Sequence, residues 1–522
     1  MRIYRAAHRG DFKRVHSLQR LLLRSWSARC LAVRQVSQDN RGKRTPGVDG
    51  IASLTPRQRC QMVDRSRDLK SSPDGIRRIY IPKASSKTEL RPLGIPTMFD
   101  RARQALVKQV LEPEWEAQFE PNSYGFRPGR SVHDAIEAIF NFIRLKPKYA
   151  LDTDIEKCFD KIAHPPLLAK LNTLPVLTRL IQGWLKAGIL DKGEWSFPET
   201  GAPQGGVISP LLMNVALHGL EQALVSAAPK RIGRKCNSPG VIRYADDLVI
   251  LHHDLETLHK LRQTAEEWLA GMGLRLKPSK TSMVHTLNER NGQVGFDFLG
   301  FHIRQYQVGK YHTRTFRDRP GFKTLIKPSL EAQKRHLKRV KEIIRQHRGS
   351  PQAALIKALN PLIRGWTRYY RTCTAKKIFD RMDLHLIHKL QQWAKFRHSR
   401  KSLGWRYRRY WQQRRNAMFF TDSTTCLVKY ATKIERHPKV ISEKSPYDGD
   451  WLYWGARLSR TPVYPKRKTT LLKSQRGKCP HCGLRFIDGN VLEVHHRNGD
   501  KNDSRYDNLL LFHAHCHDEV HG

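Results

Sequence analysis

Two acidic segments of this 522-residue chain have the residue types and spacing of a divalent-metal site. Asp246 and Asp247 lie between the largely apolar runs 241–244 and 248–251, a pattern that predicts a β-hairpin with both carboxylates at its tip. Adjacent anions repel one another unless a cation holds them, and carboxylate oxygens are the ligands that Mg²⁺ prefers. Asp154 ends another strand-like run, 149–153. If these strands are neighbours, the three carboxylates form a two-metal site, which can activate a hydroxyl and neutralise a phosphate leaving group.

Four potential metal ligands lie near the C-terminus. Two pairs, Cys479 with Cys482 and His513 with Cys516, are separated by 30 residues. Three thiolates and one imidazole at this spacing suit a tetrahedral Zn²⁺ site. The C-terminal module that contains these ligands, at 466–522, has fewer than 60 residues and cannot bury much apolar surface. The metal would therefore contribute directly to its folding free energy.

The elements that must position these groups change character along the chain. Residues 1–75 open with a helical pattern and continue into a turn-rich loop at 44–50. The apolar positions of that pattern are Val15, Leu18, Leu22 and Trp26. Short apolar runs then alternate with helical stretches, as in an α+β domain, and a helical bundle follows. The sequence predicts five units: an N-terminal extension at 1–75, an α+β domain at 76–312, a helical bundle at 313–395, a basic region with a linker at 396–465 and a Cys/His-rich module at 466–522.

The charge balance predicts a polyanionic partner. Lys and Arg outnumber Asp and Glu by 95 to 47, and a formal charge of +48 would repel itself without such a partner. Residues 384–421 contain no Asp or Glu, and cations there interleave with Trp405, Tyr407, Tyr410 and Trp411. Lys and Arg side chains can bind the phosphates of a nucleic-acid backbone, while aromatic rings stack on its bases. Nucleic acid is therefore the expected partner, and this region is expected to bind DNA.

No membrane association is expected from the sequence. No stretch approaches 18 consecutive apolar residues, and the N-terminus lacks the apolar core of a secretion signal. Six of the nine cysteines are scattered singly, as reduced thiols are in a reducing compartment. The expected location is the cytoplasm or nucleoid of a bacterium, or an organelle.

The two acidic segments and four further blocks resemble those of reverse transcriptases, in the same order along the chain. Residues 244–247 resemble the Tyr-x-Asp-Asp box, and Asp154 with Phe159 resembles the first aspartate motif. The five-residue step to Phe159 favours Asp154 over the competing carboxylates Asp152 and Asp160. The other matching blocks are 81–83 with 91–96, 201–206, 273–281 and 298–301.

This resemblance implies a right-hand polymerase with fingers, palm and an all-α thumb. It implies that Asp154, Asp246 and Asp247 hold two Mg²⁺ ions and that Phe159 excludes a ribose 2′ hydroxyl. Residues implied in nucleotide or template binding are Lys83, Arg91, Gln204 and Lys280. The implied substrates are dNTPs.

Three further segments, 44–50, 121–131 and 360–370, resemble the group II intron branch of this family. The last of them resembles its maturase, or X, domain, which also forms the thumb. Leu362, Trp366 and Tyr369 share a helical face and are expected to pack. Arg364, Arg368 and Arg371 point elsewhere and could contact RNA through shape and phosphates. The resemblance implies binding to group II intron RNA in a ribonucleoprotein, and help in its splicing.

The C-terminal module resembles an HNH nuclease with a ββα-metal fold. By that resemblance His496 is the general base, His495 and His517 hold a catalytic divalent ion, and Asn508 orients the fold. The commoner pattern has cysteine where this chain has His513, so His515 is an alternative zinc ligand. A structural zinc ribbon with surface histidines is the alternative to a nuclease.

The combination predicts a mobility protein that splices its intron, nicks a DNA target and copies RNA from the nick. The alternative is a maturase that only assists splicing and whose polymerase site is idle. A retron-like or CRISPR-associated reverse transcriptase is disfavoured by the maturase-like block and the terminal nuclease-like module.

Overall fold

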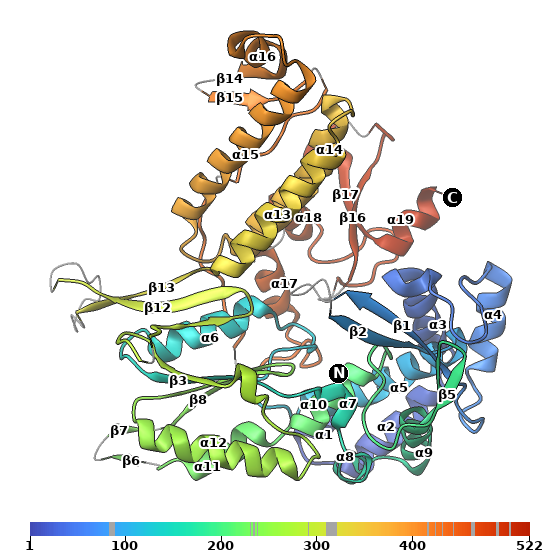
Figure 1. Cartoon of the computed structure of the whole chain (residues 1–522). Helices are drawn as coiled ribbons and strands as arrows, with labels where there is room; N and C mark the ends of the chain where they lie inside the picture. The colour runs from blue at the N-terminus through green and yellow to red at the C-terminus, as the bar shows by residue number, and fades with distance from the viewer. Residues whose placement is uncertain are drawn as a thin grey trace.

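The computed structural model describes the chain except for residues 83–88, 230, 233–234, 237, 291, 310–320, 415–416, 423, 431, 442, 461–464, 487–489, 501–502 and 522. Figure 1 shows a lower body built on two sheets, with a long helical arm rising from it and the C-terminal module beside the arm. In the described part of the chain, no helix is both long enough and apolar enough to cross a membrane.

The N-terminal region is a set of short helices around α5 (Met98–Glu116). Its elements are α1 (Arg2–His8), α2 (Phe12–Arg24), α3 (Trp26–Arg34), the π-helix η1 (Gln35–Asp39), the 3-10 helix η2 (Arg41–Arg44) and α4 (Pro56–Arg65). The predicted helical face through Trp26 was wrong. Ser25 has extended backbone and its side chain accepts from the Ala28 amide, which caps a new helix. Trp26 therefore starts α3 and is 62% exposed.

The fingers sheet has the strand order β2-β1-β4-β5. Its strands are β1 (Ile76–Pro82), β2 (Leu90–Ile95), β4 (Ile189–Asp191) and β5 (Glu194–Ser196). The antiparallel register of β1 and β2 pairs Arg78 with Gly94 and Ile81 with Arg91. Long helix α5 (Met98–Glu116) follows β2 and is buried along most of its length.

The palm sheet has the order β10-β3-β9-β8. Its strands are β3 (Tyr149–Asp154), β8 (Gly240–Tyr244), β9 (Asp247–His252) and β10 (Ser282–His285). Helix α6 (Val132–Ile143) covers one face, while α11 (Leu220–Ala227) and α12 (Leu255–Ala270) cover the other (Figure 1). Successive strand residues point to opposite faces, so Leu248 and Ile250 enter one core while Val249 and Leu251 enter the other.

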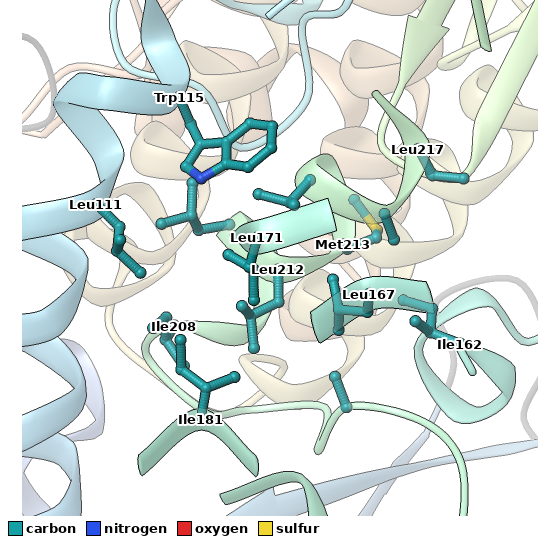
Figure 2. Packing of buried hydrophobic residues seen from close by; sticks show 14 of the residues in the cluster. Leu111, Trp115, Ile162, Leu167, Leu171, Ile181, Ile208, Leu212, Met213 and Leu217 are labelled. Carbon is teal, nitrogen blue, oxygen red and sulfur yellow. The ribbon is translucent and has the colours of Figure 1, made fainter. Parts of the chain in front are cut away.

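The larger core joins the palm to the fingers. Figure 2 shows its centre, where Trp115 of α5 lies over Leu171 and Leu212. The remaining helices and strands of this region are α7 (Cys158–Lys161), α8 (His164–Leu171), α9 (Pro175–Lys186), α10 (Ser209–Leu217), β6 (Arg231–Ile232), β7 (Lys235–Cys236) and the 3-10 helix η3 (Pro278–Lys280). This core contains residues of both subdomains, so the fingers and the palm pack together around one common hydrophobic core.

A three-stranded sheet leads into the helical arm. It has the order β11-β12-β13 and comprises β11 (Phe296–Phe298), β12 (Phe301–Gln307) and β13 (Phe322–Pro328). The arm consists of α13 (Leu330–Gln346), α14 (Gln352–Tyr370), α15 (Lys376–Arg397), α16 (Leu403–Tyr410), β14 (Trp411–Arg414) and β15 (Ala417–Phe420). This helical region after a mixed α and β domain confirms the predicted order of fold classes.

After the tip of the arm the chain runs back to the palm. Asn360 of α14 bonds the Cys426 carbonyl and the Val428 amide at 3.0 and 2.9 Å. Further on, buried Asp134 of α6 accepts from the Val440 amide at 2.7 Å and from Arg457 of α17 (Trp451–Arg460) at 2.8 Å. The region predicted at 396–465 thus contains a segment that packs along the arm and onto the palm.

The C-terminal module is a ββα unit preceded by a helix. Its elements are α18 (Lys466–Ser474), β16 (Leu492–His496), the 3-10 helix η5 (Tyr506–Asn508), β17 (Leu509–His513) and α19 (Ala514–His521). Strands β16 and β17 are antiparallel, and Leu471, Phe486 and Leu511 belong to the small core of the module.

Candidate active sites

The acidic pair lies where the sequence pattern predicts it, at the tip of a hairpin. Strands β8 and β9 pair Tyr244 with Asp247, so Ala245 and Asp246 form the turn, with Ala245 at φ +59°. Strand β3 lies on the other side of β9 and pairs Asp154 directly with Asp247. The Ile155 amide also donates to the Asp246 carbonyl at 2.9 Å. The fold therefore brings the three predicted carboxylates together.

The electrostatics of this cluster favour a bound cation. Burial, a side-chain hydrogen bond with Asp154 and the charges of Asp154 and Asp246 raise the pKa of Asp247 well above its usual range. Burial and the charge of Asp154 also raise the pKa of Asp246. Lys280 Nζ lies 2.5 Å from Asp154 Oδ2 and offsets part of this negative charge. Three mutually repelling carboxylates with oxygen donors fit divalent ions such as Mg²⁺.

Two residues predicted to bind nucleotide or template, Arg91 and Gln204, lie on or against strand β2 of the fingers. Arg91 of β2 is exposed, and its positive charge opposes the upward shift in the pKa of Asp246. The loop carrying Gln204 packs on the same strand, where the Gly94 amide donates to the Gln204 carbonyl at 2.6 Å. Lys83, also predicted here, lies outside the described residues.

Phe159 contacts the loop that carries Gln204. It is 8% exposed, on α7, and its carbonyl accepts from the Ala202 amide at 2.6 Å. Its ring makes an edge contact with Phe126 at 6.3 Å between centroids. Phe126 has a positive φ and is 52% exposed, so this pair of aromatic rings is partly open to solvent.

The competing carboxylates occupy different surroundings. Asp152 pairs with Val249 instead of with the acidic pair, and burial together with the charge of Asp297 raises its pKa to about 7. Asp160 is exposed on α7. The register of β3 thus singles out Asp154 as the partner of Asp247.

In the C-terminal module, four potential ligands converge. One ligand atom from each of Cys479, Cys482, His513 and Cys516 lies within 4.8 Å of the others. Cys482 Sγ is 3.4 Å from His513 Nδ1. Burial and the nearby charges of His515 and Arg34 lower the pKa of His513 to about 4, so its ring is neutral at pH 7. A neutral imidazole and three thiols are a donor set that suits Zn²⁺.

His515, the alternative fourth ligand, faces another element. Its Nδ1 lies 3.9 Å from Asp39 Oδ1 of η1, and Asp39 also forms an ion pair with Arg34. Its Nε2 is 3.2 Å from Cys516 Sγ, yet the four-ligand cluster contains His513. The geometry therefore favours His513 over His515.

A second histidine cluster lies between β16 and α19. The ligand atoms of His495, His517 and His521 lie within 4.8 Å of one another, and His495 Nδ1 is 3.1 Å from His521 Nε2. His521 was not among the residues predicted from the sequence. Its position four residues after His517 would have placed it on the same face of α19. Three imidazoles are a plausible donor set for a divalent transition-metal ion.

His496 and Asn508, predicted as a general base and an orienting residue, lie at the end of β16 and in η5. His496 Nε2 is buried and has no hydrogen-bond partner among the described residues. The Asn508 side chain donates to Asn498 Oδ1 at 2.8 Å and accepts from the Asn498 amide at 3.0 Å. Asn508 thereby closes the loop that joins β16 to β17.

The maturase-like helix has the two faces expected from its sequence. Trp366 packs against His336, Tyr370, Phe379 and Tyr430. Leu362 and Tyr369 pack against the same core, as predicted. Arg364 is exposed, and the charges of Arg364 and Arg371 add to burial in lowering the pKa of Arg368. This cluster of like charges suits a polyanion.

Comparison with known proteins agrees with this architecture. Residues 1–65 match the N-terminal domain of reverse transcriptase, 81–303 match Reverse transcriptase (RNA-dependent DNA polymerase), and 333–411 match the Group II intron, maturase-specific domain. Protein YkfC of Escherichia coli K12 is 32% identical over 329 residues, which cover 56% of this chain and 83% of YkfC.

Two relatives are named for group II introns or maturases. Group II intron-encoded protein LtrA of Lactococcus lactis is 33% identical over 44% of this chain, but the match covers only 38% of LtrA. Maturase-like protein 1 of Euglena gracilis is 26% identical over 71% of this chain and 73% of its own length. The chain belongs to the family of reverse transcriptases that carry a group II intron maturase domain.

Proposed function

We propose that this protein is an RNA-directed DNA polymerase and that Asp154, Asp246 and Asp247 hold the two Mg²⁺ ions of its reaction. The observation that carries the proposal is the direct pairing of Asp154 with Asp247, with Asp246 at the adjoining turn. The ions, when bound, would activate the primer 3′ hydroxyl and stabilise the departing pyrophosphate.

Other side chains would bind and orient the incoming dNTP. Arg91 and Lys83, on and just after the fingers strands, would contact the triphosphate. Gln204 would lie near the template and nucleotide. Lys280 neutralises Asp154 when no cation is bound and would be free to contact a nucleotide phosphate once metal takes its place.

A primer-extension assay tests the polymerase directly. The purified protein should extend a DNA primer annealed to an RNA template when given dNTPs and Mg²⁺, and EDTA should stop the reaction. A maturase with an idle polymerase site, the competing function, would bind intron RNA and yield no cDNA.

We expect Phe159→Val to admit ribonucleotides. The smaller side chain opens space beside the carboxylates where a 2′ hydroxyl would lie, while the backbone bond to Ala202 remains. Removing one steric clash of this kind is expected to change discrimination by about 10- to 100-fold, because a gain of 1.4 kcal/mol is tenfold in rate. Single-nucleotide incorporation with dNTP and rNTP pairs measures it. Phe126→Val is the matched control, and unchanged discrimination in the Phe159 variant would assign the gate to another residue.

The proposed maturase role, which is to help the intron RNA splice, depends on the helical arm. Arg364 and Arg368 lie on α14 away from its packed face, where phosphates of folded intron RNA could reach them. Group II intron RNA, bound as a ribonucleoprotein, is the proposed partner, and holding it in its splicing-competent fold is the proposed non-chemical function.

Salt should weaken RNA binding steeply if this surface and the +48 charge serve phosphate contact. For about 6 to 10 neutralised phosphates, affinity falls by roughly 10³ to 10⁵ between 50 and 200 mM salt. Filter binding or fluorescence anisotropy with intron RNA across this range gives the slope. A shallow slope would contradict the proposed role of the charge.

For the C-terminal module we propose an HNH nuclease that nicks the DNA target and so supplies a primer. Zn²⁺ on Cys479, Cys482, His513 and Cys516 would hold the module together. His496 would act as general base, and His495, His517 and His521 would hold a divalent ion at the scissile phosphate. The unpartnered, buried Nε2 of His496 supports this function over a structural zinc ribbon.

A further inference from the structure

Arg243, the residue before the Tyr-Ala-Asp-Asp turn, has an unusual environment for an arginine. It is 3% exposed on β8, and its guanidinium forms no direct ion pair among the described residues. The charges of Glu120 and Glu221 partly offset the lowering of its pKa by burial. Its guanidinium donates to three neutral oxygens: Ser123 Oγ at 2.6 Å, Asn214 Oδ1 at 3.0 Å and the Ala245 carbonyl at 3.2 Å. Burying an arginine without a direct counter-ion is costly, so its retention calls for a specific role.

The third of these bonds ends on the catalytic turn itself. Ala245 has φ +59°, a left-handed conformation that a non-glycine residue adopts only when the surroundings hold it. The Arg243 guanidinium holds the carbonyl of this residue, which is directly followed by Asp246. Any change in the turn would move both acidic side chains, because they are the next two residues.

The partners of Arg243 are themselves fixed to the segment 122–125. The Arg243 amide donates to the Asn122 carbonyl at 3.0 Å, and the Tyr124 amide donates to the Arg243 carbonyl at 2.9 Å. Asn214 of α10 donates to the Gly125 carbonyl at 2.9 Å. The segment therefore pairs with β8 and is tied to α10 as well.

Gly125 allows this segment to approach the turn closely. A Cβ added at Gly125 would lie 2.3 Å from the Ala245 amide nitrogen, a distance that backbone atoms cannot accommodate without moving. The segment thus contacts the turn directly, and Asn214 of α10 bonds both the segment and Arg243.

We propose that Arg243 and Asn214 are positioning residues that clamp the Ala245 turn, so that Asp246 and Asp247 present their carboxylates in the geometry that binds the catalytic divalent ions. The proposal rests on the proposed polymerase function. It also assigns a task to the 121–131 block, which joins the clamp through Asn122, Ser123 and Gly125.

Arg243→Lys is the first test, because lysine keeps the charge but cannot reach all three oxygens from one planar group. Losing a residue that orients metal ligands typically costs about 10- to 100-fold in metal affinity. We expect the Mg²⁺ concentration for half-maximal primer extension to rise by that factor, with little change in the KM for dNTP. Asn214→Ala, which removes the shared partner, should shift it in the same direction.

Arg103→Lys is the matched control. Arg103 is fully buried but is paired with Asp100 in α5, away from the turn. Thermal unfolding of all variants shows how much stability each loses. The clamp predicts that Arg103→Lys lowers stability without shifting the Mg²⁺ requirement.

Metal binding without turnover supplies an independent readout. Mn²⁺ binding, followed by electron paramagnetic resonance without dNTP, should contain sites that disappear in an Asp247→Asn variant, and Arg243→Lys should weaken those sites. An unchanged Mg²⁺ requirement and unchanged Mn²⁺ sites in folded Arg243→Lys would overturn the clamp. Wild-type protein that makes no cDNA would instead overturn the polymerase function, whatever the variants do.

Discussion

Alanine at Asp246 or at Asp247 is expected to reduce cDNA synthesis by at least about 10³-fold, because each carboxylate would hold ions that supply several kcal/mol of transition-state stabilisation. Asp247 pairs with Asp154 across the sheet, so its loss removes one side of the two-metal site. Intron RNA binding should stay nearly intact, since the cationic surfaces lie elsewhere. Primer extension and RNA binding on the same preparations measure the two effects.

Asp160→Ala is the matched control for these variants. Asp160 is also an acid close to the site in sequence, but it is exposed on α7. Its loss should leave extension close to the wild-type rate. Primer extension by the Asp246, Asp247 double variant would show that the active site has been assigned wrongly.

In the C-terminal module, His496→Ala is expected to lose about 10²- to 10⁴-fold in target-strand nicking, the usual contribution of a general base. The four proposed zinc ligands remain in this variant, so the module should stay folded and keep binding DNA. Splicing assistance and extension of an annealed primer should continue at close to the normal rate, because the polymerase carboxylates lie in the palm.

Cys479→Ala should behave differently from His496→Ala. Cys479 is fully buried, and it belongs to both the four-residue Cys/His cluster and the small core of the module. Its loss should therefore unfold the module locally and weaken DNA binding as well as nicking. Parallel assays of splicing, nicking and primer extension on each variant separate the two behaviours.

His481→Ala provides the control within the same turn. His481 lies between Cys479 and Cys482 but outside the four-ligand cluster, and it is exposed. Nicking should persist in this variant. Undiminished nicking by His496→Ala would instead leave a structural zinc ribbon as the better account of the module.

The local sequence pattern was sufficient to predict where a residue lies when a single hairpin or a single helix determines its position. The acidic hairpin follows from two apolar runs around a tight turn, and the packed face of α14 follows from the spacing of Leu362, Trp366 and Tyr369. These features depend on side-chain periodicity, which is a property of the sequence itself.

The N-terminal helices show where periodicity misleads. Val15, Leu18 and Leu22 pack as expected, but Ser25 caps a new helix and leaves Trp26 exposed. A single capping hydrogen bond overrides an apolar repeat, because it satisfies a backbone amide that would otherwise lack a partner.

Only the tertiary structure decided which distant residues share a site. The pairing of Asp154 with Asp247 depends on the register of β3 beside β9, and the bond of Asn214 to Arg243 depends on how α10 packs behind the hairpin. The return of the chain from the arm to Asp134 joins residues more than 300 positions apart. Such contacts form because strands must pair and buried polar groups must be hydrogen-bonded. The sequence shows that each of these groups needs a partner, but it does not show which residue the fold will bring next to it.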